Sequence, residues 1–201
     1  MAGKDPAAAV KAFIEPIKSA LGCFATGSVL ADSYDPATEG ILSLNGGKPT
    51  KLLGGAKVEL SFSMRYWIVE SDAPGRGPWK VTTAGYMYEL RQDGKTLYEY
   101  HWHPISESHE TLPHLHCAKL GKLHVPTGRI MIEDVLKLAV SLGAKPRNAT
   151  SWRDIDGQNR KKFERGATWG VGPAPVPRAV TVAQTPKRAV RARRSSALTI
   201  S

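Results

Sequence analysis

The sequence has few cysteines, no long apolar run and no histidine outside one short segment. Its two cysteines, Cys23 and Cys117, are too few and too far apart for a disulfide framework or a zinc knuckle, which favours a reducing compartment. No stretch approaches the about 20 apolar residues that a bilayer-spanning helix needs. Residues 1–22 lack the basic-then-apolar layout of a secretory signal peptide. We therefore expect a cytoplasmic protein without a membrane partner.

Acidic residues are absent from the C-terminal segment, residues 167–201, which holds six basic residues. Since the formal net charge is +10, this segment carries +6 of it and residues 1–166 carry the other +4. Its prolines, alanines and clustered arginines are typical of a disordered tail that follows a single domain, 1–166. Such a tail suits attraction to RNA or DNA, or serves only solubility. The residues expected to contact nucleic acid are Lys187, Arg188, Arg191, Arg193 and Arg194 in the tail, with Arg160, Lys161, Lys162 and Arg165 on a predicted helix.

Apolar spacing predicts helices at both ends of the domain and strands between them. Helical periodicity covers residues 6–22 and 131–142, and a polar helix is expected at 152–165. This order predicts an α+β fold with a mainly antiparallel sheet of four or five strands, an N-terminal helix and one or two C-terminal helices. The expected strands are 57–70, 79–91, a strand that starts at Lys95, and 114–118, and residues 29–31 and 41–44 are candidates for short strands.

Asp93-Gly94 is the clearest turn signal, because a type I′ hairpin turn needs positive φ at both central residues. A two-residue turn with an uninterrupted register places Tyr86 opposite His101. The side chains of both residues then lie on the same face of the sheet as that of Tyr88. The residues expected on this face are Ala84, Tyr86, Tyr88, Leu90, Leu97, Glu99, His101 and His103.

All six histidines lie between His101 and His124, and four of them form the pairs His101/His103 and His114/His116. Residues two apart on a strand share one face of a sheet. If the two strands lie side by side with their faces matched, four imidazoles meet in one patch.

Three roles for such a patch stay open. Four imidazoles suit a divalent transition metal ion such as zinc, iron, copper or nickel. Alternatively, they act without a cofactor as a general acid and base, with Glu107 and Arg129 in secondary roles. The third alternative is ordinary strand histidines in a structural or partner-binding protein. Cys117 follows His116 directly, so on a strand it points to the other face and is not expected to be a ligand.

The runs YDPATEGIL, KTLYEYHWHP and PHLHC resemble the TumE-type toxins of bacterial toxin–antitoxin modules, over roughly residues 10–125. The resemblance implies a small α+β protein that acts on RNA and is bound by a cognate antitoxin protein. In a metal-free ribonuclease, one neutral histidine takes the 2′-hydroxyl proton and a second, charged histidine protonates the leaving oxygen. The long basic tail and the helix after HVPTGRIMIEDVL depart from the family.

Overall fold

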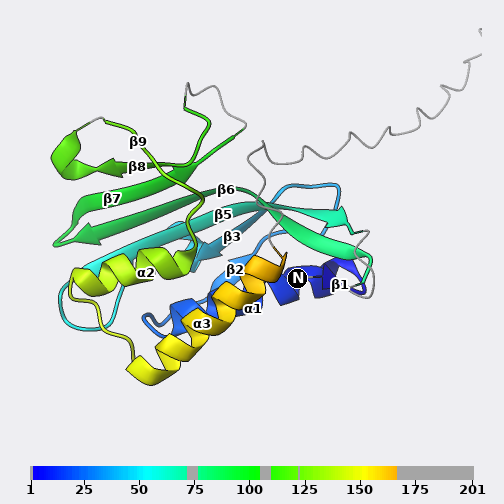
Figure 1. Cartoon of the computed structure of the whole chain (residues 1–201), viewed down its shortest axis with the longest axis horizontal. Helices are drawn as coiled ribbons and strands as arrows, with labels where there is room; N and C mark the ends of the chain where they lie inside the picture. The colour runs from blue at the N-terminus through cyan, green and yellow to red at the C-terminus, as the bar shows by residue number, and fades with distance from the viewer. Residues whose placement is uncertain (1, 72–76, 105–109, 122, 167–201) are drawn as a thin grey trace, which may run out of the picture.

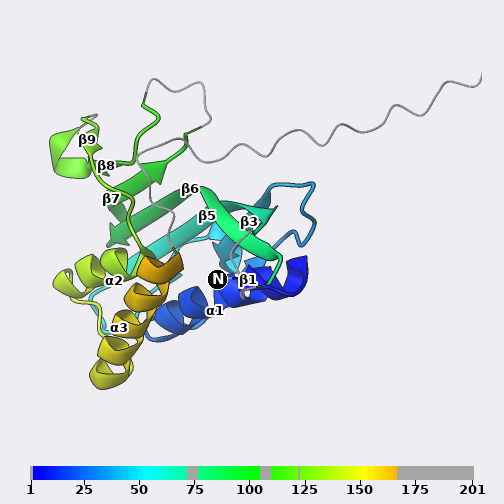
Figure 2. The ribbon, with the colours of Figure 1, turned by 45° about the vertical axis from the view of Figure 1, so that its right-hand side comes forward.

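The computed structural model describes residues 2–71, 77–104, 110–121 and 123–166. These residues form one antiparallel sheet of nine strands, and three helices cover one of its faces (Figure 1, Figure 2). The α+β class, the N-terminal helix and the two C-terminal helices are confirmed. The expected size of four or five strands is too small. Three additional strands have two residues each and are too short for periodicity to reveal them.

The strands lie in the order β2-β3-β5-β6-β7-β8-β9, while β1 pairs with β6 and β4 with β5. The strand bounds are β1 Ala2–Gly3, β2 Val29–Ala31, β3 Gly40–Leu44, β4 Thr50–Lys51, β5 Val58–Glu70, β6 Trp79–Gln92, β7 Lys95–Trp102, β8 His114–Cys117 and β9 Val125–Pro126. The helices are α1 Pro6–Gly22, α2 Ile132–Ser141 and α3 Ala149–Gly166, with short 3-10 turns at Asn45–Gly47 and Ala118–Leu120.

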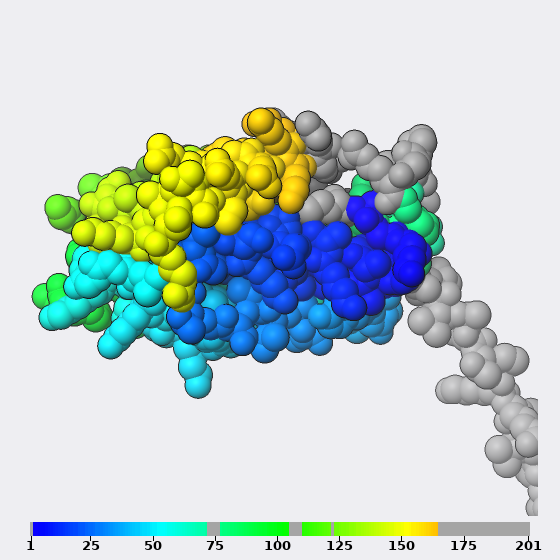
Figure 3. All heavy atoms as spheres, turned by 90° about the horizontal axis from the view of Figure 1, so that it is seen from below, coloured from blue at the N-terminus to red at the C-terminus, as the bar shows by residue number. Residues whose placement is uncertain are grey.

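Helix α1 begins where its sequence provides a cap. The side chain of Asp5 accepts a hydrogen bond from the backbone N–H of Ala8 at 2.7 Å, and Pro6 occupies the first turn, where no intrahelical N–H bond is lost. Figure 3 shows α1 and α3 side by side on the helical face. The buried Asn159 of α3 joins them by donating to the carbonyl oxygen of Pro16 at 2.9 Å.

The core lies between these helices and one face of the sheet. Alternate residues of β5 are buried there, as the sequence predicts for Leu60 and Phe62. The Tyr88 ring stacks between those of Phe62 and Tyr86, with centroids 5.4 and 4.6 Å away. These aromatic residues therefore build the core.

The β6–β7 hairpin has the predicted turn but not the predicted register. Asp93 and Gly94 both have positive φ, at 49° and 75°. The register then shifts, so that Leu90 pairs with Tyr98 and Leu97 is the extra residue of a β-bulge. Because one extra residue exchanges the two faces of the strand, the expected grouping of His101 with Tyr86 and Tyr88 is wrong.

Beyond the bulge, the side chains of β7 point alternately to the two faces of the sheet. Tyr98, Tyr100 and Trp102 pair with Leu90, Tyr88 and Tyr86 and pack toward the core. The side chains between them, Glu99 and His101, lie on the opposite face with those of Glu89 and Met87. No helix of the described residues packs against this second face, which we call the open face (Figure 2).

Within the described part of the chain, none of the helices combines the length and apolar character needed to cross a membrane.

Candidate metal centre

The two His-x-His pairs meet on the open face of the sheet. Strands β7 and β8 pair antiparallel, with His101 opposite His114 and Glu99 opposite His116. Both pairs thus share one face, as the spacing predicts if the strands are neighbours. The bulge at Leu97 decides that this is the open face and not the core.

A fifth histidine, His124, completes the cluster. The ring centroids of neighbouring imidazoles lie 4.4–6.1 Å apart, with the shortest separation between His116 and His124. The nitrogen atoms available as ligands form two groups of three, each within 4.8 Å of one another. The first group is His101, His103 and His114, and the second is His114, His116 and His124.

The position of His124 depends on a strand that the sequence pattern does not reveal. The sequence predicts only irregular or extended chain over residues 121–130, and in the structure β9 pairs with β8 through His114–Pro126 and Leu115–Val125. Continuing that register by one residue sets His116 opposite His124. Gly121, with φ at 64°, lies between the two strands and is a local signal for this reversal.

His114 belongs to both groups and is held in a defined tautomer. It is 1% exposed, and its Nδ1 lies 2.8 Å from the carbonyl oxygen of Leu112. A carbonyl oxygen only accepts hydrogen bonds, so in the neutral ring Nδ1 carries the proton and Nε2 keeps its lone pair. That Nε2 is buried and has no hydrogen-bond partner among the described residues. A backbone carbonyl fixing one ring nitrogen while the other stays available is the usual arrangement of a metal-binding histidine.

Two histidines of the cluster are disfavoured in their protonated form. Burial, followed by the charges of the neighbouring histidines, lowers the pKa of His101 to about 4. Burial and the same neighbours also lower the pKa of His116. The Nε2 of His101 is buried without a hydrogen bond and lies 3.9 Å from a carboxylate oxygen of Glu99. At neutral pH, His101 and His116 therefore present lone pairs, which is the state that a metal ion binds.

A hollow of about 350 Å³ adjoins the second group of histidines, beside Thr96 and Glu99. Burial, followed by the charge of Glu89 on the neighbouring strand, raises the pKa of Glu99. Cys117 also lines this hollow, but its sulfur belongs to neither histidine group. The hollow leaves room for water or another small molecule next to the cluster.

Of the two secondary candidates, the structure describes Arg129 alone. Glu107 lies outside the described residues. Arg129 is at the other face of the sheet, where its guanidinium carbon lies 3.8 Å from the ring centroid of Trp102. Trp102 is buried in the core, so the structure places Arg129 on the face of the sheet opposite the histidines. After β9 the chain leads to α2 on the helical side of the sheet, and Arg129 lies in this connection.

The predicted basic face of α3 is partly neutralised. Arg160 bonds the carboxylates of Asp134 and Asp156, which leaves it less available to phosphate. Lys161 and Lys162 are exposed, as the polar helix predicts. The side chain of Arg165 and the tail residues Lys187, Arg188, Arg191, Arg193 and Arg194 lie outside the described residues.

Comparisons with protein-family models, with curated proteins and with solved structures find no match to this chain. The resemblance to TumE-type toxins thus stays a prediction, and the geometry of the site carries the functional argument.

Proposed function

We propose that this protein binds one divalent transition metal ion on the open face of its sheet, through His114 with His101 and His103. The observation that carries the proposal is the Nε2 of His114, which is buried and unpartnered within a group of three imidazoles. Leaving a buried polar atom without a partner costs roughly 1–3 kcal/mol, and coordination to a metal removes that cost.

The donor set favours particular metals and one ion per chain. Neutral imidazoles suit zinc, copper, nickel or iron better than magnesium or calcium, which prefer oxygen ligands. The Nδ1 of His114 is hydrogen-bonded to the carbonyl oxygen of Leu112, so only its Nε2 can bind a metal ion. Both groups of histidines would need this one nitrogen. One ion therefore uses His114 at a time.

The first group is the better candidate because it contains two buried nitrogen atoms without hydrogen bonds, on His101 and His114. His124 of the second group is exposed. Three histidine ligands leave a fourth position for water, and zinc lowers the pKa of such a water to about 7. The proposed centre thus has the ligand number of a catalytic site.

Metal analysis of protein purified without a histidine tag tests this proposal. We expect one zinc ion per chain by elemental analysis and by calorimetric titration with Zn²⁺. His114→Ala should abolish binding, and His101→Ala should weaken it far more than His124→Ala. Ser63→Ala, a change in β5 on the same face of the sheet, serves as the matched control. Folded wild-type protein that takes up no stoichiometric metal would refute the proposal.

The resemblance to TumE-type toxins supplies the alternative, a cytoplasmic ribonuclease that works without metal and is held by an antitoxin. That mechanism needs one charged histidine as general acid, and the lowered pKa values of His101 and His116 disfavour this role for these two residues at neutral pH. Incubation of metal-free protein with RNA tests this alternative. Cleavage that persists in a chelator and disappears in His114→Ala would support it over the metal centre.

A further inference from the structure

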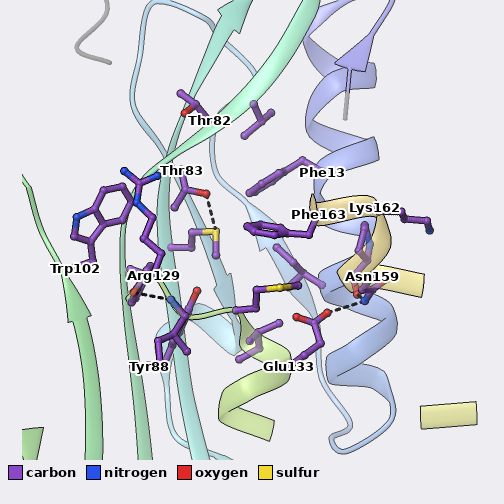
Figure 4. A pocket seen from close by; sticks show the side chains of 18 residues that line it. Phe13, Thr82, Thr83, Tyr88, Trp102, Arg129, Glu133, Asn159, Lys162 and Phe163 are labelled. Carbon is purple, nitrogen blue, oxygen red and sulfur yellow. Dashed lines mark hydrogen bonds between the residues drawn. The ribbon is translucent and has the colours of Figure 1, made fainter. Parts of the chain in front are cut away.

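A cavity of about 130 Å³ lies on the other face of the sheet, between the strands β5 and β6 and the helices. Figure 4 shows Phe13 and Phe163 on the helical side of this cavity, across from Thr83 and Arg129. Its remaining walls are largely apolar and include Ile17, Met64, Tyr86 and Trp102. None of the five clustered histidines lines it, so the metal centre does not explain it.

A polar group is buried at this cavity without a partner. Tyr88, which is fully buried, lines it, and the Tyr88 hydroxyl has no hydrogen-bond partner in the part of the chain that the structure describes. Burial raises the pKa of Tyr88 well above its usual value, so the hydroxyl keeps its proton and is a donor. A buried donor without an acceptor is unfavourable, and a ligand with a polar oxygen would satisfy it.

The charged groups around the cavity favour an anion. Arg129 and Lys162 both line it. The one carboxylate among the lining residues, Glu133, accepts a hydrogen bond from Asn159 at 2.7 Å, and burial raises its pKa. The guanidinium of Arg129 presents several N–H donors in a planar fork that matches a carboxylate. Its packing on Trp102 restricts its orientation at the cavity.

The size of the cavity limits the ligand. An engineered cavity of about 150 Å³ lined by apolar side chains binds benzene. We propose that the cavity of this protein binds a small monocarboxylate that carries one aromatic ring or a short aliphatic chain. The apolar part fills the space between sheet and helices, the carboxylate pairs with Arg129, and Tyr88 donates to an oxygen of the ligand.

Titration of the full chain with benzoate tests this site, and benzyl alcohol provides a neutral probe of similar size. We expect saturable benzoate binding, with amide and indole NMR shifts concentrated at Trp102, Ile130 and Phe13. Benzyl alcohol should bind at least roughly tenfold more weakly, because it lacks the charge that pairs with Arg129.

Arg129→Gln should weaken benzoate binding by roughly tenfold or more and leave the affinity for benzyl alcohol nearly unchanged. Arg153→Gln, a change at an exposed arginine of α3 that does not line the cavity, is the matched control. Should Arg129→Gln fail to fold, Tyr88→Phe gives a second test, with several-fold weaker benzoate binding expected.

Three results would overturn the proposal: no benzoate binding up to about 10 mM, equal binding of the neutral probe, or shifts that map to the histidine cluster. The titration uses protein without added metal, so its outcome is independent of the proposed metal centre.

Discussion

His114 has two properties that are unfavourable in combination in the metal-free protein. Its ring is almost completely buried, and its Nε2 has no hydrogen bond among the described residues. A residue selected for stability alone would be apolar at this position. The metal ion proposed above would satisfy this nitrogen.

Replacing His114 by leucine should separate stability from binding. We expect His114→Leu to raise the free energy of unfolding of the metal-free protein by about 1 kcal/mol, because the unpartnered nitrogen is removed. Zinc at about 100 times its Kd should stabilise the wild type by about 2.7 kcal/mol and leave the variant unchanged. Chemical denaturation with and without zinc measures both effects. Zinc stabilisation that survives in His114→Leu would contradict this assignment.

Glu133 gives the fold a pH dependence of its own. Burial raises its pKa, partly opposed by the hydrogen bond from Asn159, so the folded state holds its proton more tightly than the unfolded chain does. The stability linked to this group is present below the ordinary carboxyl pKa and is lost as the pH rises through the raised value.

We expect Glu133→Gln, whose amide oxygen still accepts from Asn159, to be more stable than the wild type at pH 8. The difference should disappear near pH 4, and denaturation across this range measures it. A difference that stays constant with pH would rule out this origin. Glu15→Gln, at an exposed position of α1, is the control.

Among the secondary-structure elements, the β6–β7 hairpin determines where the histidines go. Its bulge removes Leu97 from the ladder and sets Tyr98 opposite Leu90. A deletion of Leu97 should therefore leave a regular hairpin with the same pairing beyond it. We expect this deletion variant to keep its zinc affinity within a few fold and to lose less than about 2 kcal/mol of stability.

The regular register expected from the sequence makes the opposite prediction. In that register, deleting Leu97 would move His101 and His103 to the other face and abolish zinc binding. Deletion of Tyr100, which shifts His101 against β8, is the contrasting variant and should lose zinc binding. Calorimetry on variants that circular dichroism shows to be folded distinguishes the two registers.

The sequence predicts the elements of this fold better than their pairing. Helix α1 and strand β5 are predicted because their apolar periods match their structure over many residues. The turn at Asp93-Gly94 is predicted from its chemistry. The bulge at Leu97 is not, because it depends on packing Tyr98, Tyr100 and Trp102 into the core, which no local pattern reports.

The same distinction applies to the site. The shared face of each His-x-His pair follows from strand geometry, whereas the joining of the two pairs follows from the β7–β8 register. His124 depends on β9, a strand of two residues without a periodic signal. Arg129 is close to the histidines in sequence, which suggests a place at the cluster, but the chain crosses to the helical face before it.

At the scale of the whole molecule, charge is distributed very unevenly. Six of the +10 net charges come from residues 167–201, whereas Arg160 of the domain is paired with Asp134 and Asp156. Any attraction to polyanions should therefore depend mainly on the tail.

We expect a full-length variant with the six basic tail residues changed to glutamine to lose most of its affinity for single-stranded RNA. The slope of log affinity against log salt should become shallower by roughly 0.7 for each phosphate that the variant no longer neutralises. Fluorescence anisotropy at several salt concentrations measures this slope. The His114→Ala variant should bind RNA like the wild type, and weaker binding in that variant alone would assign RNA binding to the cluster instead.

The alternation of side chains along β7 gives the molecule a further property. His101 and His103 face one side of the sheet, while Trp102 between them lines the cavity on the other side. The proposed ion and the proposed carboxylate would thus be separated only by the backbone of three consecutive residues. If either ligand displaces this backbone, thermodynamic linkage requires each to change the affinity of the other by the same factor. The indole of Trp102, in the middle of that segment, is a natural fluorescent reporter of such reciprocal coupling.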